Sequence, residues 1–233
     1  MKKVAIVQSN YIPWKGYFDL IAAVDEFVLF DDVQYTRRDW RNRNQIKTPD
    51  GASWLTIPVK VKGKYSQKIC ETEIDGADWC RDHWKALQQN YKRSAYFSEV
   101  SAVLEPLYLA VAPETKMLSS LNRHFLQTLC QYLEIPTALT NSSDYKILDD
   151  RTDRLVSIVQ QAGGTEYLSG PAAKGYLDEA RFQAAAVDLT WFNYDGYPPY
   201  QQLWGEFTHG VSILDLLFNC GKNSPKYMRY VNR

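Results

Sequence analysis

The sequence predicts an α/β fold in which a mainly parallel, three-layer, Rossmann-like sheet carries a helical insertion or lobe. Short apolar runs of the length of buried strands recur along the chain, and segments with apolar residues at helical spacing lie between them. Strands that alternate with helices in this way form parallel sheets covered on both faces. A chain of 233 residues is long enough for such a domain with a lobe, and we expect one domain over 1–233.

A strand, a helix and a second strand are expected at the N-terminus. The apolar run at 4–7 ends at polar residues, apolar residues at helical spacing cover 16–24, and a second apolar run covers 27–30. A unit of this size matches a right-handed parallel crossover. Residues 54–59 predict a third strand, in which Pro58 indicates an edge or an end.

Helical spacing dominates the middle of the chain, and alternation of strands and helices resumes after it. The helical block covers about 79–133 and divides the α/β core into parts at about 1–75 and 134–233. The remaining expected strands are 135–140, 166–169 and 187–192, and the remaining helices are 153–162, 177–186 and 212–218. We therefore interpret the helical block as a lobe or an insertion of one α/β core.

Composition and charge exclude several classes of protein. The 27 Lys and Arg balance 27 Asp and Glu, so no global field favours nucleic acid or an anionic membrane. No apolar stretch is long enough for a membrane span or a signal peptide. The 4 cysteines match no zinc pattern and indicate reduced thiols, so we expect a cytoplasmic protein. The acidic pairs at 31–32 and 149–150 lack a third ligand at suitable spacing, and no metal site is predicted.

The segment 31–47 is the densest candidate site, because it follows an expected strand at the edge where open α/β sheets bind ligands. Guanidinium groups bind phosphate or carboxylate in a bidentate manner, and an indole can stack on a base or a sugar. The alternative is a solvated basic loop. The candidate substrate-binding residues here are Asp31, Arg38, Trp40, Arg41, Asn42, Arg43 and Asn44.

The loop at 8–17 is the second candidate, since it joins the first strand to the first helix. A glycine there permits close backbone approach, and a helix N-terminus offers N–H groups to an anion. The loop resembles the H-x-G-H loop of nucleotidylyltransferases but keeps only the glycine, so a divergent adenylating enzyme that uses ATP and Mg²⁺ is an alternative. The candidate substrate-binding residues of this loop are Gln8, Tyr11, Trp14, Gly16 and Tyr17.

A later strand-to-helix junction adds Ser169 and Lys174 as candidate contacts to phosphate or carboxylate, with a plain turn as the alternative. For a general base near neutral pH, three histidines are available. His83, between aromatic residues on an expected helix, ranks first as a catalytic residue, and His209 ranks second. His124 ranks last because its neighbours are apolar core positions, and each histidine has a structural role as its alternative.

Several segments are similar to the WbqC-like family, a bacterial group associated with O-antigen and related polysaccharide gene clusters. The first of them is QSNYIPWKGYF at 8–18. The others are 31–35, 38–47, 54–59, 167–170, 199–202 and 212–219, so the resemblance covers essentially the whole chain. Ser9 departs from the pattern, since proline is expected there.

The resemblance implies a transferase that moves glycine or another small acyl group onto an amino sugar in surface-polysaccharide biosynthesis. The resemblance does not identify catalytic residues, so the roles are hypotheses from residue chemistry. A nucleotide-linked sugar would be the partner, with its diphosphate held by Arg38, Arg41 and Arg43, and His83 or His209 would act as the base. No cofactor is predicted, and the acyl donor stays open between coenzyme A, an acyl carrier, an aminoacyl-tRNA and an ATP-activated acid. The balanced charge disfavours the tRNA. A non-catalytic ligand-binding or assembly protein is the other alternative.

Overall fold

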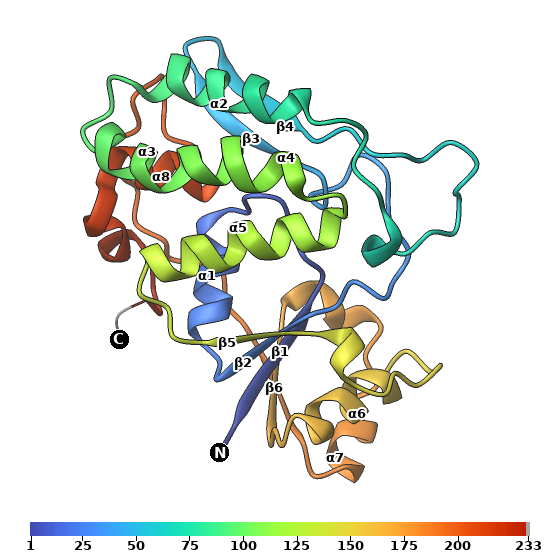
Figure 1. Ribbon diagram of the computed structural model, residues 1–233. Helices are drawn as coiled ribbons and strands as arrows, with labels where there is room; N and C mark the ends of the chain where they lie inside the picture. Colours follow the sequence, from blue (N-terminus) through green and yellow to red (C-terminus); the bar gives the residue numbers. More distant parts are fainter. Residues whose placement is uncertain (232–233) are drawn as a thin grey trace.

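The computed structural model describes residues 1–231 and contains a five-stranded parallel sheet with the order β5-β2-β1-β6-β7 (Figure 1). The strands are β1 (Lys3–Val7), β2 (Glu26–Leu29), β5 (Ala138–Asn141), β6 (Glu166–Ser169) and β7 (Asp188–Trp191). From β1 the chain builds outward through β2 to β5, and it then returns to add β6 and β7 on the other side. This doubly wound order confirms the predicted α/β class.

Helices cover both faces of the sheet, so the central strands are apolar on both sides. The helices that flank the sheet are α1 (Lys15–Ala22), α5 (Leu118–Tyr132), α6 (Asp153–Gln161) and α7 (Glu179–Ala184). α6 and α7 enclose an apolar cluster with Val4 and Val28, whereas α1 and α5 lie over the other face, around Phe18 and Phe27. Three layers follow from strands that must be buried on both faces.

The first part of the expected helical block forms a lobe beside the face of the sheet that α1 and α5 cover, whereas its last helix, α5, belongs to the layers of the sheet (Figure 1). The lobe contains α2 (Asp78–Tyr91), α3 (Phe97–Pro106), a π-helical turn (Leu107–Val111) and α4 (Ala112–Glu114), and α8 (Ile213–Cys220), from outside the block, joins it. Short 3-10 helices occur at Ile69–Glu71, Ser142–Asp144, Pro171–Gly175 and Gly221–Tyr227. α8 packs against α3, so the C-terminal helix belongs to the lobe. Within residues 1–231, every helix is too short or too polar to cross a bilayer.

The third expected strand, at 54–59, does not extend the main sheet. Instead, β3 (Arg43–Thr48) and β4 (Gly51–Thr56) form a separate two-stranded antiparallel hairpin. β3 contains the last five residues, 43–47, of the basic segment 31–47, for which the sequence alone predicts no strand. Its buried positions include Asn44 and Ile46, so a polar residue fills a place where strand patterns normally show an apolar one.

A buried carboxylate joins the lobe to the C-terminal part of the chain. Asp215 on α8 is 0% exposed and accepts hydrogen bonds from the Tyr91 hydroxyl at 2.8 Å and the Tyr200 hydroxyl at 2.9 Å. The Tyr91 hydroxyl in turn accepts a hydrogen bond from the backbone N–H of Lys47 at 2.9 Å. Burial raises the pKa of Asp215, and the bonds from Tyr200 and Tyr91 oppose that shift. The network therefore fixes α2, β3, α8 and the loop that leads to His209.

Candidate functional site

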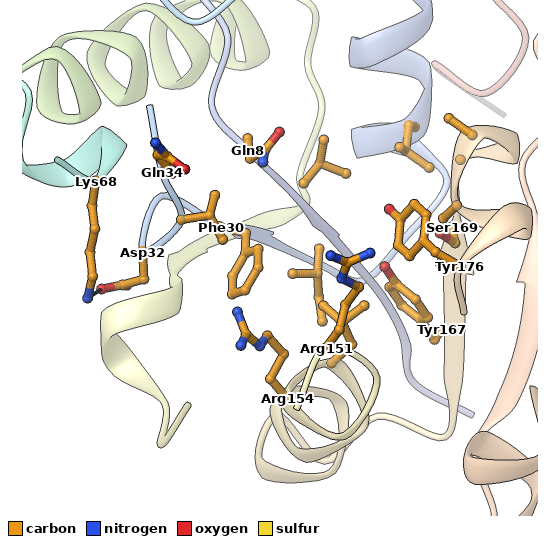
Figure 2. Close-up of a pocket in the computed structure, with 18 of the residues that line it drawn as sticks. Gln8, Phe30, Asp32, Gln34, Lys68, Arg151, Arg154, Tyr167, Ser169 and Tyr176 are labelled. Atoms are coloured by element: carbon orange, nitrogen blue, oxygen red, sulfur yellow. Dashed lines mark hydrogen bonds and ion pairs between the residues drawn. The ribbon is translucent and has the colours of Figure 1, made fainter. Parts of the chain in front are cut away.

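A large cavity, with a volume of about 810 Å³, lies at the carboxyl edge of the sheet. It is lined by Gln8 after β1, Asp32 after β2 and Ser169 at the end of β6 (Figure 2). The chain leaves β1 toward one side of the sheet and β6 toward the other. Such a switch in winding direction is where doubly wound sheets form a ligand crevice.

Two arginines at the start of α6 give this cavity a positive charge. Arg151, in the turn before α6, and Arg154, in its first turn, both line the cavity (Figure 2). The neighbouring carboxylates of Asp150 and Asp153 form ion pairs with Arg181 instead, whose Nη1 lies 2.7 and 2.9 Å from their Oδ1 atoms. Within residues 1–231, neither cavity arginine forms an ion pair, and Arg154 donates to backbone carbonyls of the preceding turn. Two guanidinium groups are therefore available to an anionic ligand.

The far end of the cavity carries an ion pair. The Asp32 carboxylate lies 3.5 Å from Lys68 Nζ and accepts a hydrogen bond from the Ser142 hydroxyl at 2.7 Å. Figure 2 shows this pair at one side of the cavity, with Arg154 and then Arg151 farther along it. The cavity thus has a carboxylate with its own counter-charge at one side, followed by two cations without ion-pair partners in residues 1–231.

Aromatic rings complete the lining of the large cavity. Tyr167, Tyr176 and Tyr194 line it, and the Arg151 guanidinium lies 5.5 Å from the centre of the Tyr176 ring. Burial raises the pKa of both Tyr167 and Tyr194 to about 12, so their hydroxyls stay protonated at neutral pH. These groups offer flat apolar surface together with hydrogen-bond donors, as ligand pockets commonly do.

A second cavity of about 350 Å³ lies beside the loop between β1 and α1. Four of the residues predicted from the sequence meet in its lining: Trp14, Trp40, Asn44 and His209. These residues come from the first loop, the basic segment and the loop before α8, so the fold gathers them from distant parts of the chain. Asn10, Pro13 and Gly210 complete the lining.

Arg41 lies between the two cavities. Its guanidinium donates one hydrogen bond to Gln8 Oε1 and another to Asn10 Oδ1. Gln8 lines the large cavity and Asn10 lines the small one. The rings of Trp14, in the small cavity, and Tyr194, in the large one, are also in contact, with centroids 5.4 Å apart. The two cavities therefore adjoin at the loop that follows β1.

His209 is the histidine that reaches a cavity. Its ring packs edge-on against Phe207, with centroids 4.5 Å apart. Partial burial lowers the pKa of His209, and the nearby Lys15 ammonium lowers it further. The imidazole is consequently neutral at pH 7 and able to accept a proton.

His83 lies elsewhere, in the core between the lobe and the first loop. It is 6% exposed, and its Nδ1 shares a hydrogen bond of 2.9 Å with the Tyr11 hydroxyl, which also contacts the Tyr108 hydroxyl at 2.6 Å. Burial lowers the pKa of His83 to about 4, against a smaller opposing effect of the Thr56 carbonyl. The side chain reaches neither of the two cavities described above. This environment is typical of a structural histidine.

The pKa of His83 predicts how stability depends on pH. The unfolded chain takes up a proton near pH 6.5 and the folded chain only near pH 4, so stability is lost as pH falls between these values. We expect the free energy of unfolding at pH 5 to be about 2 kcal/mol lower than at pH 7 from this group alone, at 1.36 kcal/mol per pKa unit. Urea titrations of His83→Asn should lack this loss, whereas those of the exposed His124→Asn should keep it. An imidazole of His83 that titrates near its ordinary pKa by NMR would contradict the expectation.

Several predicted residues hold the site in place from outside the cavities. Asp31 is buried and accepts a hydrogen bond from the Ser9 backbone N–H at 2.8 Å, and Tyr17 donates to the Gln8 carbonyl at 2.9 Å. Asn42 donates to the Ile57 carbonyl at 2.8 Å. At Gly16, an added Cβ would lie 2.3 Å from the Trp14 ring, so only glycine lets that indole pack across α1.

Three predicted cations lie away from both cavities. Arg43 stacks on Trp54, with its guanidinium 4.0 Å from the ring centre, and donates to the Arg38 carbonyl. Arg38 itself is exposed and has a φ of 58°. Lys174 is exposed, and its ammonium lies 5.5 Å from the centre of the Trp191 ring. By contrast, Ser169 lines the large cavity, and Arg41 binds Gln8 and Asn10, which line one cavity each.

Arg151 and Arg154 are the main residues that sequence reasoning missed. Cations at a helix N-terminus oppose the helix dipole, so their placement in the first turn region of α6 is unfavourable without another purpose. That local signal was available in the run from Asp149 to Arg154. A local sequence pattern cannot show, however, that this turn packs close to the ends of β1 and β6.

The chain is a doubly wound α/β protein with an arginine-lined cavity at the switch point of its sheet and a smaller cavity beside it. The chain belongs to the WbqC-like protein family, whose model matches residues 8–227. A protein of Mycobacterium tuberculosis (strain ATCC 25618 / H37Rv), described as uncharacterized protein Rv1507c, is 57% identical over 230 residues, which are 99% of each chain. No solved structure matches this chain.

Proposed function

We propose that the protein is a transferase that acylates the amino group of a nucleotide-linked sugar. The observation that carries the proposal is the pair of adjoining cavities with Arg41 between them, because a transfer reaction needs two ligands held next to each other. The large cavity would take the nucleotide, and the small one the acyl group. Membership of the WbqC-like family supports this assignment through the expected link to polysaccharide biosynthesis.

Charge decides which cavity takes the nucleotide. A nucleotide-linked sugar carries a diphosphate, and Arg151 and Arg154 are cations without ion-pair partners in the described part of the chain. The role that the sequence suggests for Arg38, Arg41 and Arg43 passes to these two in our proposal. The rings of Tyr176 and Tyr194 would flank the nucleotide or the sugar.

The chemistry would occur where the cavities meet. The sugar amine attacks the acyl carbonyl carbon, a C–N bond forms, and the bond between the acyl carbon and the donor's leaving group breaks. His209 would accept the proton that the nitrogen loses, since its lowered pKa keeps it neutral at pH 7. Arg41 could then place positive charge beside the oxygen that becomes negative during attack.

The experiment is a transfer assay read by mass spectrometry. Nucleoside-diphosphate amino sugars are incubated with acetyl coenzyme A, with glycyl coenzyme A, or with glycine and ATP–Mg²⁺. We expect a mass gain of one acyl group on the sugar, and a rate about 100-fold lower in His209→Ala, the low end for general base catalysis. The matched control is His124→Ala, which changes an exposed histidine on α5 and should keep full rate. Tight binding of the nucleotide sugar without transfer from any donor would contradict the transferase and favour a binding protein.

A further inference from the structure

We propose that the large cavity selects ribonucleotides, with the Asp32 carboxylate binding the ribose hydroxyls. The inference rests on the proposed function only in taking the ligand of this cavity to be a nucleotide. It adds the class of nucleotide and the residue that recognises it.

The position of Asp32 in the sheet suits a contact with ribose. It lies just beyond β2, which pairs with β1 on the side away from β6. The cavity extends from Asp32, past Gln8 at the end of β1, to Ser169 at the end of β6. In doubly wound sheets that bind nucleotides, an acidic residue after the second strand is suitably placed to bind ribose hydroxyls.

The polarity of the cavity is the second argument. A carboxylate accepts hydrogen bonds and repels phosphate, so Asp32 fixes the end of the cavity where phosphate does not lie. Arg154 and then Arg151 lie farther along the cavity from Asp32 (Figure 2). The loop after β1 has no glycine-rich phosphate cradle, and the arginines of α6 supply the charge instead. A nucleotide would therefore lie with its ribose at β2 and its diphosphate beside α6.

The local bonding of Asp32 is the third argument. Ser142, from the 3-10 helix after β5, donates to Oδ2 at 2.7 Å, whereas Oδ1 lies 3.5 Å from Lys68 Nζ and accepts a long bond from the Cys70 thiol at 3.9 Å. These partners orient the carboxylate and compensate its charge. Oδ2 keeps an acceptor position, and at Oδ1 a ribose hydroxyl would replace the weak thiol donor. The Asp32 side chain retains 19% of its exposure, so a ligand in the cavity can reach it. Two adjacent acceptors match the two hydroxyls of a ribose.

A deoxyribose would leave one of these acceptors without its donor. Sites built to hydrogen-bond a hydroxyl discriminate strongly against the analogue that lacks it, because a desolvated acceptor stays unpaired. We expect the wild type to bind a ribonucleoside diphosphate about 10-fold or more tightly than its 2′-deoxy counterpart, from the loss of one hydrogen bond to a charged group.

The test is calorimetric titration with matched pairs: UDP and dUDP, GDP and dGDP, ADP and dADP, CDP and dCDP, with dTDP added. The readout is the ratio of the two dissociation constants in each pair, because Asp32→Asn also removes a charge that repels phosphate and so changes both affinities. We expect this ratio to fall from about 10 or more in the wild type to below about 3 in Asp32→Asn. Asp149→Asn removes the same charge next to the arginines but outside the cavity lining, and it should keep the wild-type ratio.

The outcomes separate this inference from the proposed function. Equal binding of ribose and deoxyribose forms by the wild type, a preference for dTDP, or an unchanged ratio in Asp32→Asn would each overturn the role of Asp32 while leaving a nucleotide site. Absence of binding by every nucleoside diphosphate would overturn both proposals.

Discussion

Replacing Arg151 and Arg154 together by alanine is expected to weaken the binding of a nucleoside diphosphate by about 100-fold or more. Each charge-assisted hydrogen bond contributes about 1.5–3 kcal/mol, and 1.4 kcal/mol is tenfold in affinity. Both guanidinium groups line the large cavity, and neither has an ion-pair partner in residues 1–231. A bound phosphate would therefore form an ion pair with each of them. Calorimetric titration of the wild type and the double variant measures the loss.

Two further variants make this result specific. Arg151→Lys with Arg154→Lys keeps both charges but loses the bidentate geometry, so an intermediate affinity is expected. Lys174→Ala removes an exposed cation that the cavity lining does not include, and it should leave affinity unchanged. Equal affinity of the double alanine variant and the wild type would show that Arg151 and Arg154 do not bind the diphosphate.

Asp215→Ala is expected to lower the free energy of unfolding by about 3 kcal/mol or more. The substitution removes the acceptor of the Tyr91 and Tyr200 hydroxyls, which are both buried. Urea denaturation followed by circular dichroism measures the effect.

The control for this prediction is Asp215→Asn. An amide keeps one acceptor oxygen of similar shape, so only one of the two tyrosine hydroxyls loses its partner, and we expect a loss of about 1–2 kcal/mol. A loss below about 1 kcal/mol in Asp215→Ala would show that the network is not needed for stability.

The sequence predicts the main sheet well because its strands are short and apolar. The strand expected at 166–169 has the same bounds as β6, and those expected at 4–7, 27–30 and 187–192 each lie within one residue of β1, β2 and β7. The runs in β1, β2 and β6 are mostly buried, as central strands of a parallel sheet are, whereas β7 lies at the edge and is only partly buried. The hairpin is different, since Arg43–Thr48 is polar and pairs only with β4. Its register depends on contacts that no local pattern records.

The candidate site could be predicted only in part. Gln8 and Ser169 follow from their places at strand ends, because the carboxyl edge of a parallel sheet is known once the strands are known. The density of arginines in the segment 31–47 predicts an anion site there. In the structure, however, the Arg43 guanidinium stacks on the Trp54 ring, and the Arg41 guanidinium donates hydrogen bonds to the side-chain amides of Gln8 and Asn10. Arg151 and Arg154 reach the cavity through the packing of α6, which long-range contacts determine.

The most direct test of the account is a crystal structure of the protein soaked with UDP, or with the diphosphate that binds best. We predict density for both phosphates in the large cavity, within hydrogen-bond distance of Arg151 or Arg154, with the ribose toward Asp32. Diphosphate density in the small cavity beside Trp40 and His209, with the large cavity empty, would contradict the assignment of the two cavities.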